Sequence, residues 1–118
     1  MKHVIHSDSS EFFRKLMKTF FSEVGLECES FERGNEVVDA VSKGRASFVI
    51  TGLELADMSG EELIKRLIVL PGKIPIIIVT SNEEAKRSKT LEALGVKAII
   101  MKSGDWKGEL SNLLGLKA

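Results

Sequence analysis

The sequence predicts an α/β fold in which a five-stranded parallel sheet is covered by helices on both faces. Short apolar runs alternate with segments of helical period along the whole chain, and each pair forms one strand–helix unit. The length of 118 residues accommodates five such units in a single domain. The run IPIIIVT at residues 74–80 is apolar without alternation, which is typical of a strand buried on both faces of a parallel sheet.

The first unit is a strand at residues 2–7 followed by a strongly apolar helix. Ser9 or Ser10 caps the start of this helix, and Gly25 ends it after about Val24. Its apolar side chains spread over roughly 180°, which is wider than the stripe of about 100° that docking on a sheet requires. We therefore expect some apolar surface to remain exposed at the rim of this helix.

The second unit has the pattern of a sheet edge. Residues 26–31 alternate apolar and acidic side chains, so one face of this strand is exposed and Cys28 faces inward. The elements that follow are a helix at residues 35–42 and a third strand at residues 47–51.

The second half of the chain predicts three further helices and two further strands. Ser59 caps a helix that continues until Pro71 and Gly72 end it. After the strand at 74–80, residues 83–94 have few apolar anchors and many charges, so this helix should be the most loosely held. A strand at residues 98–102 and a last helix from about Trp106 to Gly115 complete the fold.

Composition excludes several classes of function. Seventeen basic residues balance seventeen acidic ones, so no general field attracts nucleic acid or an anionic membrane. The single cysteine, Cys28, cannot form an internal disulfide, and the amino terminus has neither a signal core nor a run of membrane length. We expect one soluble, cytoplasmic domain at residues 1–118, monomeric or weakly dimeric, with no output domain and no nucleic-acid or membrane partner.

Five strand–helix units permit a flavodoxin-like (βα)₅ sheet of order 2-1-3-4-5, whose sites lie at the carboxyl ends of the strands. In this chain those ends are SDSS, Thr51-Gly52, Thr80-Ser81 and Lys102-Ser103. Together with the segments FFRKLM, LELADMSGEEL, IPIIIVTS and ALGVKAIIMK, they make the whole chain resemble the receiver domains of two-component response regulators.

This resemblance implies a phosphoryl-transfer pocket. Receivers accept a phosphoryl group on an aspartate after the third strand, with a magnesium ion held by that aspartate and by an acidic pair after the first strand. Asp8, Thr80 and Lys102 match the family pattern, whereas Ser9 replaces the second acid and Gly52 stands at the acceptor position. A glycine has no side chain to phosphorylate, so the resemblance implies a degenerate pocket and weak magnesium binding at Asp8 at most.

Two further departures affect the switch of the family. Ser103 replaces the usual proline after Lys102, so we expect no cis peptide bond there. Ile99 replaces the Tyr or Phe that moves inward on activation. Both changes predict that no signal passes from this pocket to the surface.

Individual side chains have simpler interpretations. We expect Asp8 to pair with Lys102 rather than to bind a cation, and we expect Glu54 and Asp57 to be solvated loop acids, although either is a possible substitute acceptor. His3 and His6 should lie on opposite faces of their strand, with His6 in the core and no shared metal. Cys28 should be a buried apolar side chain.

The function that follows is a non-enzymatic, stand-alone pseudo-receiver without a cofactor, which binds proteins independently of phosphorylation. Its expected partners are a histidine kinase, a phosphotransfer domain or another signalling protein, and Phe12 and Phe21 are the candidate interface residues. One alternative is an active receiver phosphorylated by a histidine kinase at Asp57 or Glu54. Another is a binder of a small phosphate ligand such as FMN, although the turn around Asp8 lacks glycine and its carboxylate repels phosphate.

Overall fold

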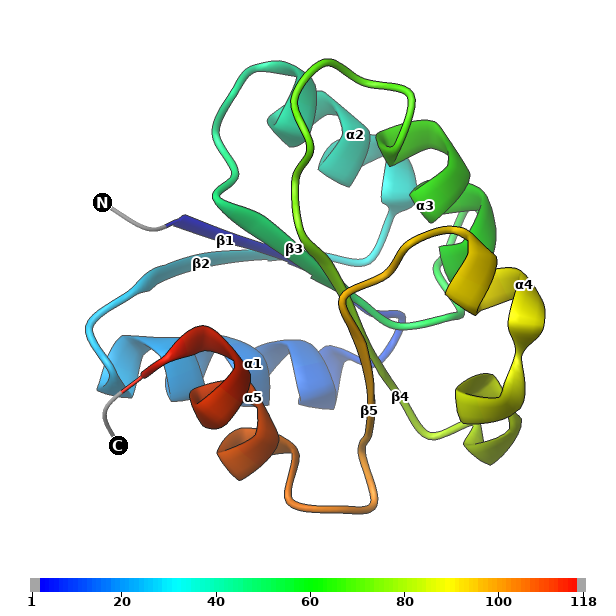
Figure 1. The fold of residues 1–118 in the computed structure, drawn as a ribbon. Helices are drawn as coiled ribbons and strands as arrows, with labels where there is room; N and C mark the ends of the chain where they lie inside the picture. Colours follow the sequence, from blue (N-terminus) through cyan, green and yellow to red (C-terminus); the bar gives the residue numbers. More distant parts are fainter. Residues whose placement is uncertain (1–2, 117–118) are drawn as a thin grey trace.

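The computed structural model describes residues 3–116, and its centre is a five-stranded parallel sheet in the order β2-β1-β3-β4-β5 (Figure 1). This order confirms the prediction. The strands are β1 (His3–Ser7), β2 (Glu27–Phe31), β3 (Phe48–Thr51), β4 (Ile76–Thr80) and β5 (Ala98–Met101). The predicted first strand included Lys2, which lies outside the described residues.

Helices cover both faces of the sheet, as expected. Figure 1 shows α1 (Glu11–Glu23) and α5 (Trp106–Leu114) together on one side of the sheet, and the remaining helices on the other side. These are α2 (Gly34–Ser42), α3 (Gly60–Leu67), the 3₁₀ turn η1 (Glu83–Arg87) and α4 (Lys89–Ala93). Ser10, Ser59 and Asp105 cap α1, α3 and α5 with side-chain oxygens, which places each helix start directly after a strand or its loop.

The strand sequences explain the two-sided core. Val4 and Ile5 are both fully buried, but Val4 packs with the α1 and α5 side chains and Ile5 with those of α2 and α3, because successive side chains of a strand point to opposite faces. Every residue of β4 is buried, as its unbroken apolar run predicts. β2 is an edge strand and is only partly buried, which agrees with its alternating sequence.

Several predicted boundaries differ from the structure by one to three residues. α3 ends at Leu67, before the predicted end at residue 70, because Ile68 is its C-cap and the chain then turns toward Pro71. β4 begins at Ile76 rather than at residue 74, since Pro75 has no N–H to donate to the ladder. β5 ends at Met101, one residue before Lys102.

The segment predicted as one weak helix, residues 83–94, is divided into η1 and α4. Ser88 has an extended backbone between them, and its hydroxyl accepts a hydrogen bond from the Leu91 amide at 3.2 Å. Asn82 caps η1 in the same manner, through the Glu84 amide at 3.0 Å. Ser88 therefore interrupts the first helical turn and starts a second.

Candidate functional site

The carboxyl ends of the central strands bring the predicted pocket residues together. Ser7 is paired with Thr51 and Thr80 with Met101, so the residues that follow these strands lie at one edge of the sheet. They surround a cavity of about 110 Å³, which is lined by Asp8, Gly52, Leu53, Glu54, Val79, Thr80, Ser81, Asn82 and Lys102.

Asp8 is buried and uses both of its carboxylate oxygens. Oδ1 accepts a hydrogen bond from the Ser10 amide at 2.9 Å. Oδ2 lies 2.8 Å from Lys102 Nζ, in the geometry of an ion pair rather than of an aligned hydrogen bond. Only 3% of the Asp8 surface is exposed. The carboxylate is therefore held from two sides in a poorly solvated position.

Gly52 lies directly beneath this carboxylate. A Cβ atom added to Gly52 would lie 2.9 Å from Asp8 Oδ2 and 3.3 Å from Asp8 Cγ, both closer than ordinary contact. The backbone at Gly52 is not left-handed, so glycine is not required there by φ. Glycine is favoured here by space, because a side chain at position 52 would press on the Asp8 carboxylate, which would have to shift.

Lys102 is fixed between an anion and an aromatic ring. Its Nζ atom lies 4.3 Å from the centroid of the Phe13 ring and 2.8 Å from Asp8 Oδ2. Its amide donates to the Thr80 carbonyl at 2.8 Å, which anchors the turn after β5. The cation is thus neutralised by a carboxylate and further attracted by the face of Phe13.

The hydroxyl groups near the pocket mostly serve the backbone. The Thr80 hydroxyl accepts a hydrogen bond from the Asn82 amide at 3.1 Å, and the Thr80 residue is only 5% exposed. Ser9 is exposed and does not line the cavity, although its amide donates to the Glu54 carbonyl at 3.3 Å. Thr80 is therefore at the pocket wall, whereas Ser9 is on the surface beside it.

The two candidate substitute acceptors lie in different places. Glu54 is exposed and lines the cavity. Asp57 instead caps α2, accepting from the Gly34 amide at 2.7 Å and the Asn35 amide at 3.1 Å. Desolvation acts to raise the pKa of Asp57, but these amide hydrogen bonds outweigh it and lower the pKa below its ordinary value. Asp57 thus has a structural task away from the cavity.

The two positions that depart from the switch pattern lie along and after β5. Ile99 is partly buried and packs against the core between the sheet and the α2–α4 layer. Ser103 is exposed in the turn after Lys102, and all peptide bonds of the described residues are trans.

The histidines lie on opposite faces of β1. His6 is fully buried, its Nδ1 atom lies 2.6 Å from the Ser30 hydroxyl, and burial followed by the charges of Lys102 and Arg14 lowers its pKa to about 3. His3 faces Glu27, with Nδ1 3.2 Å from its carboxylate. Within residues 3–116, no group of three or more His, Cys, Asp or Glu side chains is arranged to hold a metal ion.

Cys28 is partly buried, packs against the core and is not paired with another cysteine. Burial is the main cause that raises its pKa to about 12. The thiol is therefore neutral at physiological pH, as expected for an apolar side chain.

The two candidate interface residues differ sharply. Phe12 is 74% exposed on the first turn of α1, whereas Phe21 is fully buried and packs against Phe20 and Phe48. The expectation that Phe21 belongs to an interface is therefore wrong. The apolar arc of α1 was too wide to show from sequence which phenylalanine faced outward.

Sequence reasoning missed the residues that support the pocket. Arg14 Nη1 donates to the Asp8 carbonyl at 2.8 Å, and the Ser7 hydroxyl donates at 2.7 Å to the Thr51 hydroxyl, which in turn donates to the Gly52 carbonyl at 2.9 Å. The hydroxyl residues at the ends of two neighbouring strands, Ser7 and Thr51, were the one sequence signal for this hydrogen-bond chain. The role of Phe13 depends on a tertiary contact and had no local signal.

Comparison with known proteins gives a consistent result. The family model described as response regulator receiver domain matches residues 4–112. Sporulation initiation phosphotransferase F of Bacillus subtilis is 31% identical over 84 residues, which cover 69% of this chain and 68% of that protein. The DNA-binding transcriptional regulator NtrC of Klebsiella pneumoniae is 28% identical over 81 residues, 69% of this chain but 17% of NtrC.

Solved structures agree on the fold. The chemotaxis response regulator CheY4 of Vibrio cholerae superposes with a TM-score of 0.85 at 21% identity and covers 98% of each chain. In relatives such as NtrC, the aligned region is a small part of a longer protein. No helix within residues 3–116 has the length and hydrophobicity that a membrane span requires.

Proposed function

Because the chain belongs to the response regulator receiver domain family, we propose that it is a pseudo-receiver of a two-component or phosphorelay pathway. In this role it binds protein partners independently of phosphorylation and catalyses no reaction. Receiver domains of this family act through contacts with histidine kinases or phosphotransfer proteins, and the proposal keeps such contacts while removing the phosphoryl switch.

The space above Gly52 is the observation that carries this proposal. A receiver needs a carboxylate nucleophile at this position, and here the position has no side chain and the Asp8 carboxylate lies 2.9 Å from where a Cβ atom would be. Lys102, the cation that would balance a phosphate, already pairs with Asp8 at 2.8 Å. A phosphoryl group would therefore meet neither an acceptor nor a free counter-charge.

The ion pair between Asp8 and Lys102 disfavours a magnesium ion in this pocket. Mg²⁺ requires near-octahedral oxygen ligands and is usually held in proteins by one or two carboxylates. The buried carboxylate here is Asp8, and an ion at its Oδ2 would have to displace Lys102. We propose that magnesium binds weakly at most and that the module uses no other cofactor.

Phe12 is the proposed contact residue for the protein partner. It is 74% exposed and lies two positions after Ser10, the residue that caps α1 beside the pocket. An exposed aromatic ring supplies the kind of anchor that dominates protein interfaces. The partner class is a histidine kinase, a phosphotransfer domain or another signalling protein of the pathway.

The alternative of a substitute acceptor depends on Glu54, because Asp57 is engaged in capping α2. Glu54 is exposed and lines the cavity, but Lys102 faces Asp8 rather than Glu54. The geometry thus supports phosphorylation at Glu54 less well than the absence of phosphorylation.

The phosphate-ligand alternative has little support from the shape of the site. The cavity of about 110 Å³ is smaller than the 300 to 1,000 Å³ that is typical of ligand pockets. The wider groove next to it, of about 680 Å³, is lined by two carboxylates, Glu61 and Glu84, and one guanidinium, Arg87. Neither hollow gathers positive charge for a phosphate group.

Intact-mass measurement after incubation with acetyl phosphate and magnesium tests the proposal. We expect no phosphoryl adduct, and beryllofluoride with magnesium should cause no saturable chemical-shift changes at residues 52, 80 and 102. An adduct that Glu54→Gln abolishes and Asp57→Asn leaves intact would establish the substitute-acceptor alternative. An adduct lost only with Asp57→Asn would show that the capping carboxylate becomes accessible, and it too would contradict the proposal.

A further inference from the structure

The amino ends of β4 and β5 carry an exposed apolar surface at the opposite end of the sheet from the pocket. We call it the amino-end face and define it by Ile68, Val69, Leu70, Ile74 and Val96. Val69 is 79% exposed and Ile68 49% exposed, and Phe12 is the other large apolar residue with comparable exposure in the described chain. Ile68 and Val69 are adjacent in the sequence, so this exposed apolar surface involves more than one isolated side chain.

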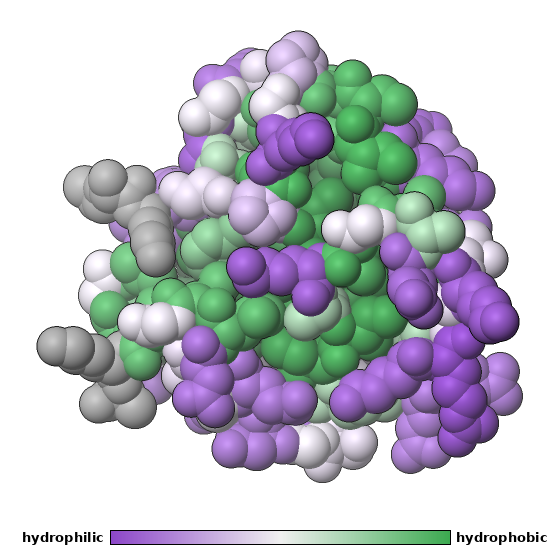
Figure 2. Space-filling view, in the orientation of Figure 1, coloured by the Kyte–Doolittle hydropathy of each residue, from purple (hydrophilic) through white to green (hydrophobic). Residues whose placement is uncertain are grey.

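Three members of this face share one core cluster. Leu70, Ile74 and Val96 pack against the same core cluster, and the Lys97 amide donates to the Ile76 carbonyl at 2.8 Å, which joins the two strand starts. Figure 2 shows hydrophobic atoms gathered over the α3–β4 connection, at the upper edge of this view. Leu70, Ile74 and Val96 therefore lie over one core cluster, and the exposed Ile68 and Val69 precede Leu70 in the α3–β4 connection.

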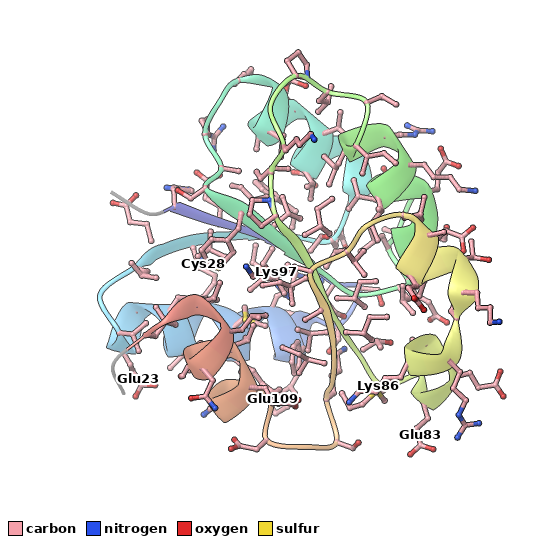
Figure 3. All side chains as sticks on the ribbon, in the orientation of Figure 1. Glu23, Cys28, Glu83, Lys86, Lys97 and Glu109 are labelled. Atoms are coloured by element: carbon pink, nitrogen blue, oxygen red, sulfur yellow. The ribbon has the colours of Figure 1, made fainter. Side chains whose placement is uncertain are left out.

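Two lysines next to this face have no carboxylate partner among the described residues, while one lysine and one glutamate, Lys86 and Glu92, line a shallow hollow together with Val96. Lys73 and Lys97 are exposed, and neither has a carboxylate within 4.0 Å among residues 3–116. The cations of the adjoining α3 are neutralised, since Lys65 pairs with Glu61 at 3.3 Å and Arg66 with Glu62 at 3.1 Å. Figure 3 shows Lys97 near the centre of the same view, at the beginning of β5.

We propose that the amino-end face binds an acidic amphipathic segment of a protein partner. The apolar side chains of that segment would cover Val69 and Ile68, and its carboxylates would pair with Lys73 and Lys97. A second copy of this chain fits less well, because a symmetric contact would bring the unpaired lysines of two copies together. A strand length separates this face from the pocket, so the inference stands whether or not the pocket accepts phosphate.

Titration of the ¹⁵N-labelled protein with two synthetic helical peptides tests this inference. Both peptides have leucine at the same helical spacing, with glutamate at the remaining positions of one and lysine at those of the other. We expect the acidic peptide to shift the amide signals of residues 68–74 and 96–97 and not those of 8, 52 and 102. The basic peptide should bind at least about tenfold more weakly.

Charge reversal makes the test specific. The double variant Lys73→Glu/Lys97→Glu should reverse the preference in favour of the basic peptide, and Val69→Ser should weaken both peptides about fivefold or more. Lys107→Glu is the matched control, because this exposed lysine lies over the Trp106 ring on α5. It should leave both affinities within about twofold of the original.

Four outcomes would overturn the inference. The first two are equal affinity for the two peptides and amide shifts centred on α1 or on the pocket. The third is a preference for the acidic peptide that the double variant does not reverse. The fourth is tighter binding to vesicles of phosphatidylcholine and phosphatidylglycerol than to the acidic peptide. Self-association by sedimentation that Val69→Ser abolishes would assign the face to a second copy instead. The result is independent of the acetyl phosphate experiment, so failure of one leaves the other standing.

Discussion

Replacing Gly52 with alanine tests whether Asp8 fills the space above residue 52. The substitution adds one carbon atom 2.9 Å from Asp8 Oδ2 and 3.3 Å from Asp8 Cγ, while the next neighbour, the Val79 carbonyl oxygen, lies at an ordinary 3.7 Å. Non-bonded atoms prefer separations of about 3.5 Å or more, so the Asp8 carboxylate must move by several tenths of an ångström.

Movement of Asp8 weakens its two interactions. A hydrogen bond to a charged group contributes about 1.5 to 3 kcal/mol, so weakening the bond from the Ser10 amide at 2.9 Å and lengthening the ion pair with Lys102 at 2.8 Å should together cost about 2 kcal/mol. Alanine at a position without left-handed backbone gains about 0.4 to 1 kcal/mol through the unfolded chain. The expected net loss of unfolding free energy is therefore about 1 to 2 kcal/mol.

A double-mutant cycle isolates this contact. In an Asp8→Ala background the carboxylate is absent, so Gly52→Ala should be neutral or stabilising by up to about 1 kcal/mol, and the coupling energy should exceed about 1 kcal/mol. Gly104→Ala is the matched control, because its added carbon would lie 3.8 Å from the Met101 carbonyl oxygen and 3.9 Å from Glu109 Oε2. It should behave alike in both backgrounds.

Urea unfolding followed by the fluorescence of Trp106, the single tryptophan of the chain, measures each free energy. If Gly52→Ala costs the same in both backgrounds within about 0.5 kcal/mol, Asp8 does not restrict this space, and the pseudo-receiver proposal rests on the missing acceptor side chain alone.

Three further changes should have measurable effects. The pKa of His6 is about 3 in the folded protein against an ordinary 6.5, so the unfolded chain binds the extra proton and stability falls as pH drops through this range. Between pH 6.5 and pH 5 the unfolding free energy should fall by about 2 kcal/mol for this reason. In urea unfolding at these two pH values, His6→Gln should remove this part of the pH dependence, and an unchanged pH dependence would contradict the prediction. Phe12→Ala should change the unfolding free energy by less than about 1 kcal/mol and weaken partner binding, measured by calorimetry, by about 1 to 3 kcal/mol. Phe21→Ala should lower the unfolding free energy by about 3 to 5 kcal/mol. Similar losses of stability for the two variants would show that Phe12 is a core residue. Gly60→Ala would place a carbon atom in overlap with the Gly52 carbonyl oxygen, so we expect the unfolding free energy to fall by about 3 kcal/mol or more. A melting temperature within a few degrees of the original would show that the backbone is not packed this closely.

The sequence predicted the architecture because local patterns and the fold agree. The unbroken apolar run of β4, the serine cap of α3 and the alternation of β2 each fix an element without reference to the rest of the chain. The boundaries that were predicted wrongly depended on single residues. Ser88 is one of them, because its side chain caps a new helix instead of continuing the preceding one.

The sequence predicted where the site lies in the fold but not which side chains touch one another in it. The residues after parallel strands had to meet at one edge, so the neighbourhood of Asp8, Gly52 and Lys102 follows from strand order alone. That Asp8 would fill the space above Gly52, and that Phe13 would support Lys102, depend on distances between side chains far apart in sequence. Phe21 shows the same limit, since a wide apolar arc does not say which edge of a helix is covered.

The division of residues 83–93 at Ser88 has a consequence for how this segment opens. η1 and α4 each have five residues and a side-chain cap of their own, and each anchors one buried residue, Ala85 and Leu91 respectively. Neither piece carries hydrogen bonds that propagate into the other across Ser88, so helical cooperativity stops there. The two pieces can therefore unravel one at a time, and their backbone amides should exchange with solvent at two separate rates rather than as one unit. A continuous helix would have tied this flank of the sheet to a single opening event.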